Sequence, residues 1–87
     1  MIREEVRVGG PHGLHARPAA QLVQEAARFE SRLRLYRGER GADAKSILEV
    51  MSLAARPGET VILEAEGPDE KEAVARLKPL IKGEAPS

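Results

Sequence analysis

Hydrophobic residues recur along the chain at two different spacings, and each spacing predicts a different kind of element. Alternation of apolar and polar residues is typical of a half-buried strand. It predicts three strands, at residues 2–8, 32–36 and 60–66. Apolar residues three and four positions apart are typical of an amphipathic helix. They predict three helices, at residues 16–29, at 47–53 and from residue 70 onward. Gly38 and Gly41 break the chain after the second strand, which predicts a hairpin to a short further strand at residues 40–43.

The sequence also marks where two of these helices begin and where one is disturbed. Ser46 followed by Glu49 matches the capping box, in which the hydroxyl and the carboxylate satisfy backbone N–H groups at the helix start. We therefore expect Ser46 to cap the helix that starts at residue 47. Asp69 is expected to cap the last helix. Pro79 removes one backbone N–H, so this helix is expected to kink or end near Leu77.

Strands with one apolar face and helices with one apolar stripe predict an α+β fold, in which an open antiparallel sheet carries its helices on one face. The other face is then uncovered, and its expected residues are charged: Arg3, Arg7, Arg32, Arg34, Glu64 and Glu66. We interpret these charges as cross-strand pairs rather than as a basic binding patch. Periodicity does not settle the order of the strands, and a ferredoxin-like arrangement would give much the same pattern.

Composition narrows the classes of function. The chain has 87 residues, which suits one domain spanning 1–87 and leaves no room for a separate cofactor domain. Its 14 basic and 14 acidic residues balance, and only Tyr36 and Phe29 are available for stacking on bases, which argues against nucleic-acid binding. The absence of cysteine excludes disulfides, thiol catalysis and thiolate metal sites. No apolar run approaches the ~18 residues that span a bilayer, and the N-terminus lacks a signal-peptide core, so we expect a cytoplasmic protein without membrane insertion.

Residues 13–19 read Gly-Leu-His-Ala-Arg-Pro-Ala and contain the most distinctive chemistry of the chain. Pro18 fits the first turn of a helix, since its missing N–H has no intrahelical use there. His15 is therefore predicted to lie just ahead of backbone N–H groups and the positive end of the helix dipole, a place that favours a bound phosphate. The same field disfavours imidazolium, so His15 is expected to be largely neutral and nucleophilic. Arg17 adds a planar fork that matches phosphate oxygens.

Less specific interpretations of these residues stay open. His15 could be a surface histidine at a helix start, and Arg17 a solvated cation placed unfavourably against the dipole. That unfavourable placement itself indicates an anionic ligand. His12 and His15 could form a metal pair, but the sequence shows no further ligand beside them, so we expect neither a metal nor a cofactor.

Two blocks of the sequence resemble one known family. Residues 13–20 are similar to the active-site motif of the HPr family, the histidine-containing phosphocarriers of the bacterial phosphoenolpyruvate:sugar phosphotransferase system (PTS). Residues 45–53, which read Lys-Ser-Ile-Leu-Glu-Val-Met-Ser-Leu, resemble the regulatory-serine segment of that family. The element order and the length agree as well, so the resemblance covers nearly the whole chain. It implies an open-faced β-sandwich whose four antiparallel strands have the order 1-4-2-3, with three helices on one side.

The resemblance also implies a function and its residues. The chain would act as a cytoplasmic phosphocarrier, not an enzyme, that accepts a phosphoryl group from enzyme I and passes it to the EIIA domain of a sugar permease. His15 would be phosphorylated on Nδ1, and Arg17 and the backbone N–H groups of Ala16 and Arg17 would hold the phosphoryl group. Ser46 matches the site that a dedicated kinase, HPr kinase/phosphorylase, modifies in many Gram-positive relatives.

A docking face for enzyme I and EIIA is implied on the first two helices. It comprises the positions that match the family's contact residues: Ala16, Ala20, Gln21, Gln24, Ile47, Leu48 and Met51. A helix as short as the second cannot bury all of its apolar residues. We therefore expect at least Leu48 or Met51 to be exposed.

Three residues depart from the family pattern. His12 occupies a loop position more often held by a small polar residue, Glu49 stands where many serine-regulated relatives have glycine, and Pro79 interrupts the last helix. Glu49 would repel a phosphate on Ser46, which weakens a regulatory role for that serine. The alternative function is a regulatory phosphoprotein, either of the nitrogen-related PTS or a binding module read through Ser46. One seryl-phosphate relative in the family lacks the active histidine, and His15 argues against that branch.

Overall fold

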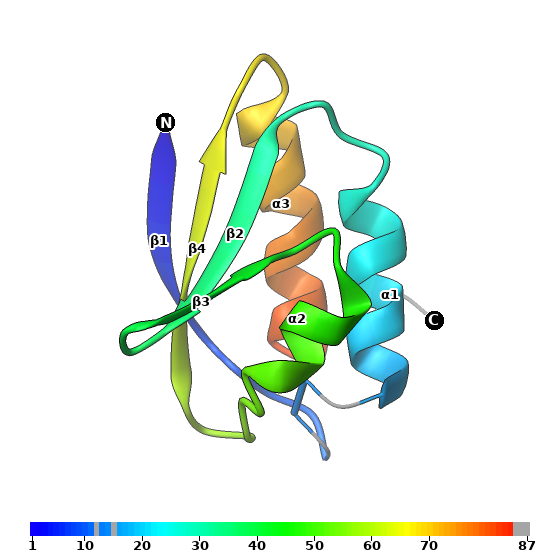
Figure 1. The fold of residues 1–87 in the computed structure, drawn as a ribbon, viewed down its shortest axis with the longest axis vertical. Helices are drawn as coiled ribbons and strands as arrows, with labels where there is room; N and C mark the ends of the chain where they lie inside the picture. The colour runs from blue at the N-terminus through cyan, green and yellow to red at the C-terminus, as the bar shows by residue number, and fades with distance from the viewer. Residues whose placement is uncertain (12, 15, 85–87) are drawn as a thin grey trace.

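The computed structural model describes residues 1–11, 13, 14 and 16–84, and it shows a sheet with a layer of helices against it (Figure 1). Within these residues the elements follow one another as β1 (Ile2–Arg7), α1 (Ala16–Ala26), β2 (Arg32–Arg37), β3 (Arg40–Asp43), α2 (Ile47–Ser52), β4 (Thr60–Glu66) and α3 (Glu70–Ile81). The strands form one antiparallel sheet in the order β1-β4-β2-β3. In Figure 1 the helices all lie on the same side of that sheet. The expected class, strand order and helix layer are confirmed.

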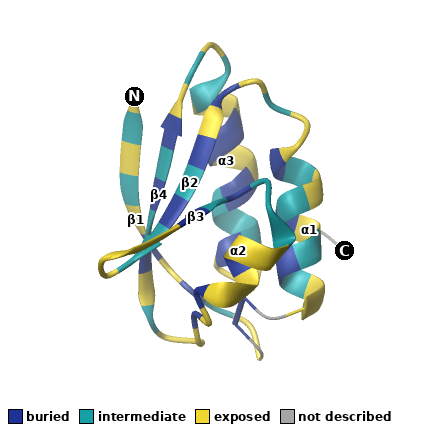
Figure 2. Ribbon diagram, viewed as in Figure 1, coloured by how far each residue is buried: buried dark blue, intermediate teal, exposed yellow. Residues whose placement is uncertain are grey.

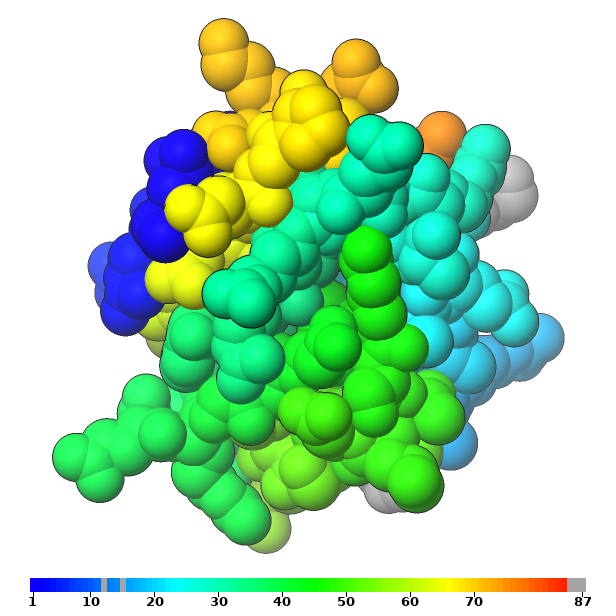
Figure 3. Space-filling view, turned by 45° about the horizontal axis from the view of Figure 1, so that its top comes forward, coloured from blue at the N-terminus to red at the C-terminus, as the bar shows by residue number. Residues whose placement is uncertain are grey.

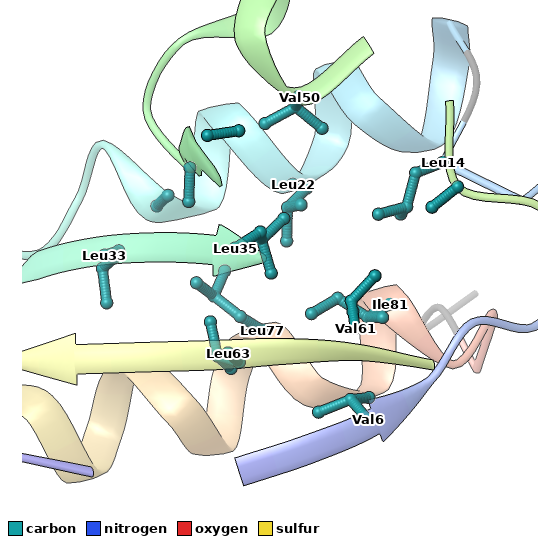
Figure 4. Packing of buried hydrophobic residues seen from close by; sticks show 14 of the residues in the cluster. Val6, Leu14, Leu22, Leu33, Leu35, Val50, Val61, Leu63, Leu77 and Ile81 are labelled. Atoms are coloured by element: carbon teal, nitrogen blue, oxygen red, sulfur yellow. The ribbon is translucent and has the colours of Figure 1, made fainter. Parts of the chain in front are cut away.

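The core lies between the sheet and the helices. Leu35 on β2 faces Leu63 on β4, and both are fully buried. From the helix layer, Leu22 of α1 and Leu77 of α3 pack toward them, as Figure 4 shows. Buried residues alternate with less buried ones along β2 and β4 (Figure 2). Burying a leucine stabilises the fold by roughly 1.5–3 kcal/mol. These contacts fix α1, and with it the start of that helix, against the sheet.

Most element boundaries agree with the sequence-based prediction to within one residue, but α1 is shorter than predicted. It ends at Ala26 rather than at residue 29. The N–H of Arg28 donates to the Glu25 carbonyl at 3.1 Å, and the N–H of Phe29 donates to the Ala26 carbonyl at 3.2 Å. Both bonds span three residues instead of four, which tightens the chain into a turn. The Lys45 Nζ then donates to the Phe29 carbonyl at 2.7 Å and links this end of α1 to the segment ahead of α2.

Of the two outcomes expected from Pro79, a kink or an end near Leu77, the end is wrong, because α3 continues through Pro79 to Ile81. Pro79 removes only its own N–H, and hydrogen bonding resumes beyond it, where the Lys82 N–H donates to the Lys78 carbonyl at 3.0 Å. Beyond the proline, Ile81 is fully buried and Leu80 packs partly against the core. An internal proline costs about 3 kcal/mol, and burying a side chain such as Ile81 contributes roughly 1.5–3 kcal/mol. Packing of the last turn is therefore of the size needed to offset the proline.

Ser46 caps α2 as predicted, but the Glu49 carboxylate accepts from a residue other than Ser46. The Glu49 N–H donates to the Ser46 Oγ at 3.3 Å. The Glu49 carboxylate accepts from the Asp43 N–H at 3.0 Å, while the Ser46 N–H donates to the Asp43 carbonyl at 2.9 Å. The start of α2 is therefore tied to the end of β3.

Asp69 stands at the N-cap position of α3, but the prediction that its side chain caps that helix is wrong. Its carboxylate accepts from the N–H groups of Glu30 and Ser31, both at 2.9 Å, and from the Ser31 hydroxyl. Ser31 is 1% exposed, so its N–H and hydroxyl depend on the carboxylate for a partner. The Ser31 hydroxyl first, and then the Glu30 N–H, hold the pKa of the Asp69 carboxyl below its ordinary value. Asp69 thus ties the α1–β2 connection to the start of α3.

Asp69→Asn is expected to lower the melting temperature at neutral pH. An amide offers one acceptor oxygen where the carboxylate offers two, so at least one bonded donor loses its partner. Since folding lowers this pKa, the charged form stabilises the protein above the ordinary carboxyl pKa, and that stability is lost as the pH falls through the lowered value. Melting curves of variant and wild type should therefore converge in acid. A melting temperature at neutral pH no lower than that of Glu5→Gln, at an exposed carboxylate on β1, would contradict this.

The uncovered face of the sheet confirms cross-strand pairing at one of the expected positions. Arg3 on β1 faces Glu64 on β4, and its Nη1 lies 2.8 Å from the carboxylate. The register sets Arg34 on β2 opposite the same glutamate. Arg3 and Arg34 also flank the ring of Tyr36, at 5.6 and 5.7 Å from its centroid. The Arg3 side chain is 58% exposed, so its ion pair contributes only about 0–1 kcal/mol.

Candidate functional site

The candidate phosphate site lies where the β1–α1 loop meets α1. His15 and His12 are outside the described residues, so their predicted roles stay predictions. α1 begins at Ala16, directly after His15 in the sequence, as predicted. The first turn of α1, which is described throughout, contains no acidic residue. No carboxylate of that turn therefore opposes an anion at the positive end of the dipole.

The two residues ahead of His15 are held against the loop that follows α2. Leu14 is 2% exposed at one end of the buried cluster (Figure 4), and its N–H donates to the Ala55 carbonyl at 3.0 Å. Gly13 has a φ of +64°, and a Cβ there would lie 2.5 Å from the Ala55 carbonyl oxygen. Glycine alone meets both requirements without strain. Tertiary contacts therefore fix the backbone that leads into position 15, and no local sequence pattern marks Ala55 for this contact.

Arg17 is exposed in the first turn of α1, while Ala19 and Leu22 bury the opposite side of the helix. Gln21 and Gln24, four and seven positions after Arg17, are exposed as well. This spacing places the three polar side chains on one stripe of the helix. A cation at this end of a helix is unfavourable unless an anion binds near it. The guanidinium is thus accessible to a phosphoryl group or to a partner protein.

The predicted docking face is exposed as expected. On α1 its residues are exposed or half-buried: Ala16, Ala20, Gln21 and Gln24. On α2, Leu48 is 80% and Met51 38% exposed, while Ile47 packs partly against the core. Figure 3 shows the green surface of α2 directly beside the blue-to-cyan surface of α1, and the two helices are in contact. The structure therefore brings these residues onto one surface, and their docking role stays a prediction.

Ser46 is half-buried at the N-cap of α2, and its oxygen already accepts a hydrogen bond from Glu49. A phosphate on this oxygen would gain from the helix dipole but would lie beside the Glu49 carboxylate. The observed hydrogen bond makes Ser46 a structural cap. Its regulatory role stays a prediction.

A groove of about 650 Å³ opens between α1 and α3, and sequence reasoning missed it. Gln21 and Gln24 line it on α1, and Ala75, Pro79 and Leu80 line it on α3. The groove shares the two glutamines with the predicted docking face but includes no residue of the first turn of α1. No short sequence motif marks this groove, because its shape depends on how two helices that are distant in the sequence pack together.

No group of three or more His, Cys, Asp or Glu side chains in the described part of the chain is arranged to hold a metal ion. The His12–His15 pair lies outside that part. None of the described helices is long and apolar enough to cross a membrane.

Comparison with known proteins agrees with this architecture. A family profile described as "PTS HPr component phosphorylation site" matches residues 2–83. The phosphocarrier protein HPr of Cupriavidus necator is 47% identical over 81 residues, which cover 93% of this chain and 91% of that protein. The HPr-like protein Crh of Bacillus subtilis is 44% identical over 84 residues, which cover 97% of this chain and 99% of that protein. A crystal structure of HPr from Thermoanaerobacter tengcongensis superposes with a TM-score of 0.90 at 41% identity, covering 95% of this chain and 93% of that one. By sequence and by fold alike, the chain belongs to the HPr family of the phosphotransferase system.

Proposed function

We propose that the chain is a cytoplasmic phosphocarrier that accepts a phosphoryl group on His15 from phospho-enzyme I and passes it to the EIIA domain of a sugar permease. The observation that carries this proposal is the start of α1. His15 immediately precedes a helix whose first turn has no carboxylate and exposes Arg17. Membership of the HPr family supports the same role. The chain would be a stoichiometric carrier with no turnover of its own.

Transfer would begin with attack of the neutral His15 Nδ1 on the phosphorus of the donor's phosphohistidine. A P–N bond forms at His15 as the donor's P–N bond breaks, and the donor imidazole leaves with the bonding electron pair. The transition state is mostly loose, so positioning and neutralisation of charge account for most of the rate. Arg17 and the positive end of α1 would supply that neutralisation. Discharge repeats the same step, with the acceptor on EIIA as the attacking group.

A carrier must also release what it binds. Arg17 is exposed, and interactions of a solvent-exposed charge are weak and screened by salt. A phosphoryl group held mainly by one such arginine and by a helix start is stabilised during transfer without being trapped. The accessible position of Arg17 therefore suits reversible transfer between two partners.

The carrier function is tested by incubating the protein with phosphoenolpyruvate and enzyme I. Intact mass spectrometry should show one added phosphate, and brief acid treatment should remove it, because phosphohistidine is acid-labile and phosphoserine is not. Subsequent addition of an EIIA domain should return the chain to its original mass. Absence of the added phosphate with active enzyme I would overturn the proposal.

Leu48→Ser is expected to raise the KM for enzyme I about tenfold and to leave the maximal rate unchanged. Loss of an apolar contact at the centre of an interface costs ~1–2 kcal/mol, and 1.4 kcal/mol corresponds to tenfold in affinity. Leu48 is 80% exposed, so the fold should tolerate the change. Leu48→Met keeps an apolar side chain and should retain most of the affinity. An unchanged KM in Leu48→Ser would remove this residue from the docking face.

A second candidate function is a regulatory protein read through its phosphorylation state. The similarity to Crh of Bacillus subtilis, described with its solution structure as the "Catabolite Repression HPr", favours it, since 44% identity is close to the 47% shared with a phosphocarrier. Ser46 would be the modified residue, although Glu49 beside it opposes an added phosphate. Labelling of Ser46 by a kinase, or a pull-down dominated by a partner other than a permease, would favour this function. Rapid transfer to EIIA would favour the carrier.

A further inference from the structure

Arg37 binds both ends of the short segment that contacts Leu14. This arginine is the last residue of β2, and its Nη1 donates to the Leu53 carbonyl at 2.9 Å. Its Nη2 donates to the Glu59 Oε2 at 2.8 Å. The other carboxylate oxygen of Glu59 accepts from the Arg56 N–H at 2.7 Å. Arg37 therefore holds the chain directly at Leu53 and, through Glu59, at Arg56.

The two residues between these points are the ones that matter for the candidate site. Ala54 has a φ of +53°, a left-handed conformation that a residue with a Cβ adopts at a cost. Ala55 is 4% exposed, and its carbonyl accepts the Leu14 N–H at 3.0 Å. Relaxation of Ala54 toward a negative φ would turn the Ala55 carbonyl away from Leu14. The hydrogen bonds on either side oppose that relaxation.

Two hydrogen bonds stabilise the ionised form of the Glu59 side chain. The hydrogen bond from Arg37 first, and that from the Arg56 N–H second, hold the pKa of the Glu59 carboxyl below its ordinary value. Both oxygens of the carboxylate are engaged by different segments of the chain. The Arg37 and Glu59 side chains are 32% and 36% exposed, so solvent screens their charges, and the restraint on the connecting segment comes from the three hydrogen bonds acting together.

We propose that Arg37 and Glu59 form a positioning clamp for the phosphate site, acting through the Ala55 carbonyl on the backbone that leads from Leu14 into His15. This inference rests on the proposed carrier function. Neither side chain needs to touch the phosphoryl group, so both are positioning residues. Phosphoryl transfer depends on placement of the reacting groups, and a small displacement slows it strongly.

Arg37→Ala is the variant that tests the clamp, and Arg3→Ala is its matched control. Arg3 also lies in the sheet and forms an ion pair with the same 2.8 Å separation, but its partner is Glu64 on β4. We expect Arg37→Ala to lower the maximal rate of transfer from phospho-enzyme I about threefold to tenfold, with the KM for enzyme I unchanged. Hydrogen exchange of the Leu14 amide should be faster than in wild type. Arg3→Ala should match wild type in both measurements, and Arg37→Lys should recover part of the rate.

Each result decides a separate point. A maximal rate in Arg37→Ala equal to that of Arg3→Ala would overturn the clamp while leaving the carrier function intact. Unchanged exchange of the Leu14 amide would overturn the route through Ala55. Failure of the wild type itself to accept phosphate would overturn the carrier function and the clamp's role in transfer together. If Arg37→Ala does not fold, Glu59→Gln provides the same comparison, because its amide oxygen can still accept from Arg56 while the ion pair is lost.

Discussion

His15→Ala is expected to abolish phosphorylation of the chain by phosphoenolpyruvate and enzyme I. Alanine has no nucleophilic nitrogen, and neither Arg17 nor the start of α1 can replace one, because they only stabilise charge. The sequence contains one other histidine, His12, and His12→Ala is therefore the matched control. It should still gain one acid-labile phosphate, as measured by intact mass. The circular dichroism spectra of both variants should match that of the wild type.

The phosphorylation rate of Arg17→Ala is expected to lie between those of His15→Ala and His12→Ala. The variant retains the nucleophile but loses the exposed cation of the first turn, so phosphate should be transferred slowly rather than not at all. Labelling of His15→Ala at the wild-type rate would refute the assignment of the acceptor. Loss of labelling in His12→Ala alone would move the acceptor to position 12.

Gly13→Ala adds a single methyl group, yet we expect it to lower the free energy of unfolding strongly. A Cβ on a left-handed backbone costs about 1–2 kcal/mol, and the forced displacement of the Ala55 carbonyl adds a further ~1–3 kcal/mol. Gly38→Ala is the control, since Gly38 has nearly the same φ, +61° against +64°, yet no atom lies within 4 Å of the added Cβ. Urea denaturation of the two variants should separate the cost of the backbone conformation from the cost of the contact.

The same variant should also slow phosphoryl transfer, although no charged or nucleophilic group is removed. Displacing the Ala55 carbonyl weakens the hydrogen bond from Leu14 and so disturbs the backbone ahead of His15. Gly38→Ala, in the hairpin between β2 and β3, should transfer phosphate at the wild-type rate. If urea denaturation shows equal losses of unfolding free energy in Gly13→Ala and Gly38→Ala, the contact between position 13 and the Ala55 carbonyl adds no cost of its own.

The fold was predictable wherever a local pattern decides the structure. Alternation in β4 and the glycines around β3 predict both strands with the bounds that the structure has. The sequence-based prediction failed where distant packing outweighs local preference. Pro79 stays inside α3 because Ile81 is buried beyond it, and Asp69 gives its own helix no side-chain cap because its carboxylate accepts from buried Ser31, in another connection.

At the candidate site, the start of α1 was predictable for the same reason, but the tertiary contacts around it were not. His15, Arg17 and Pro18 are neighbours in sequence, so their spacing alone indicates a helix start with phosphate chemistry. Ala55 and Arg37 reach that region only through the packing of the β2 end and the loop after α2. Backbone carbonyls and left-handed residues such as Ala54 have no sequence motif, so reasoning from residue types does not find them.

The strand order has a consequence for synthesis of the chain on the ribosome. β1 is made before the other described strands, but in the described sheet it pairs with β4, which sets Ile2 opposite Ala65. A nascent chain that stops before Thr60 has no partner for its first strand, and its β2–β3 hairpin lacks the strand that joins the two halves. The sheet therefore closes only once β4 is available, whatever the order in which the earlier elements form.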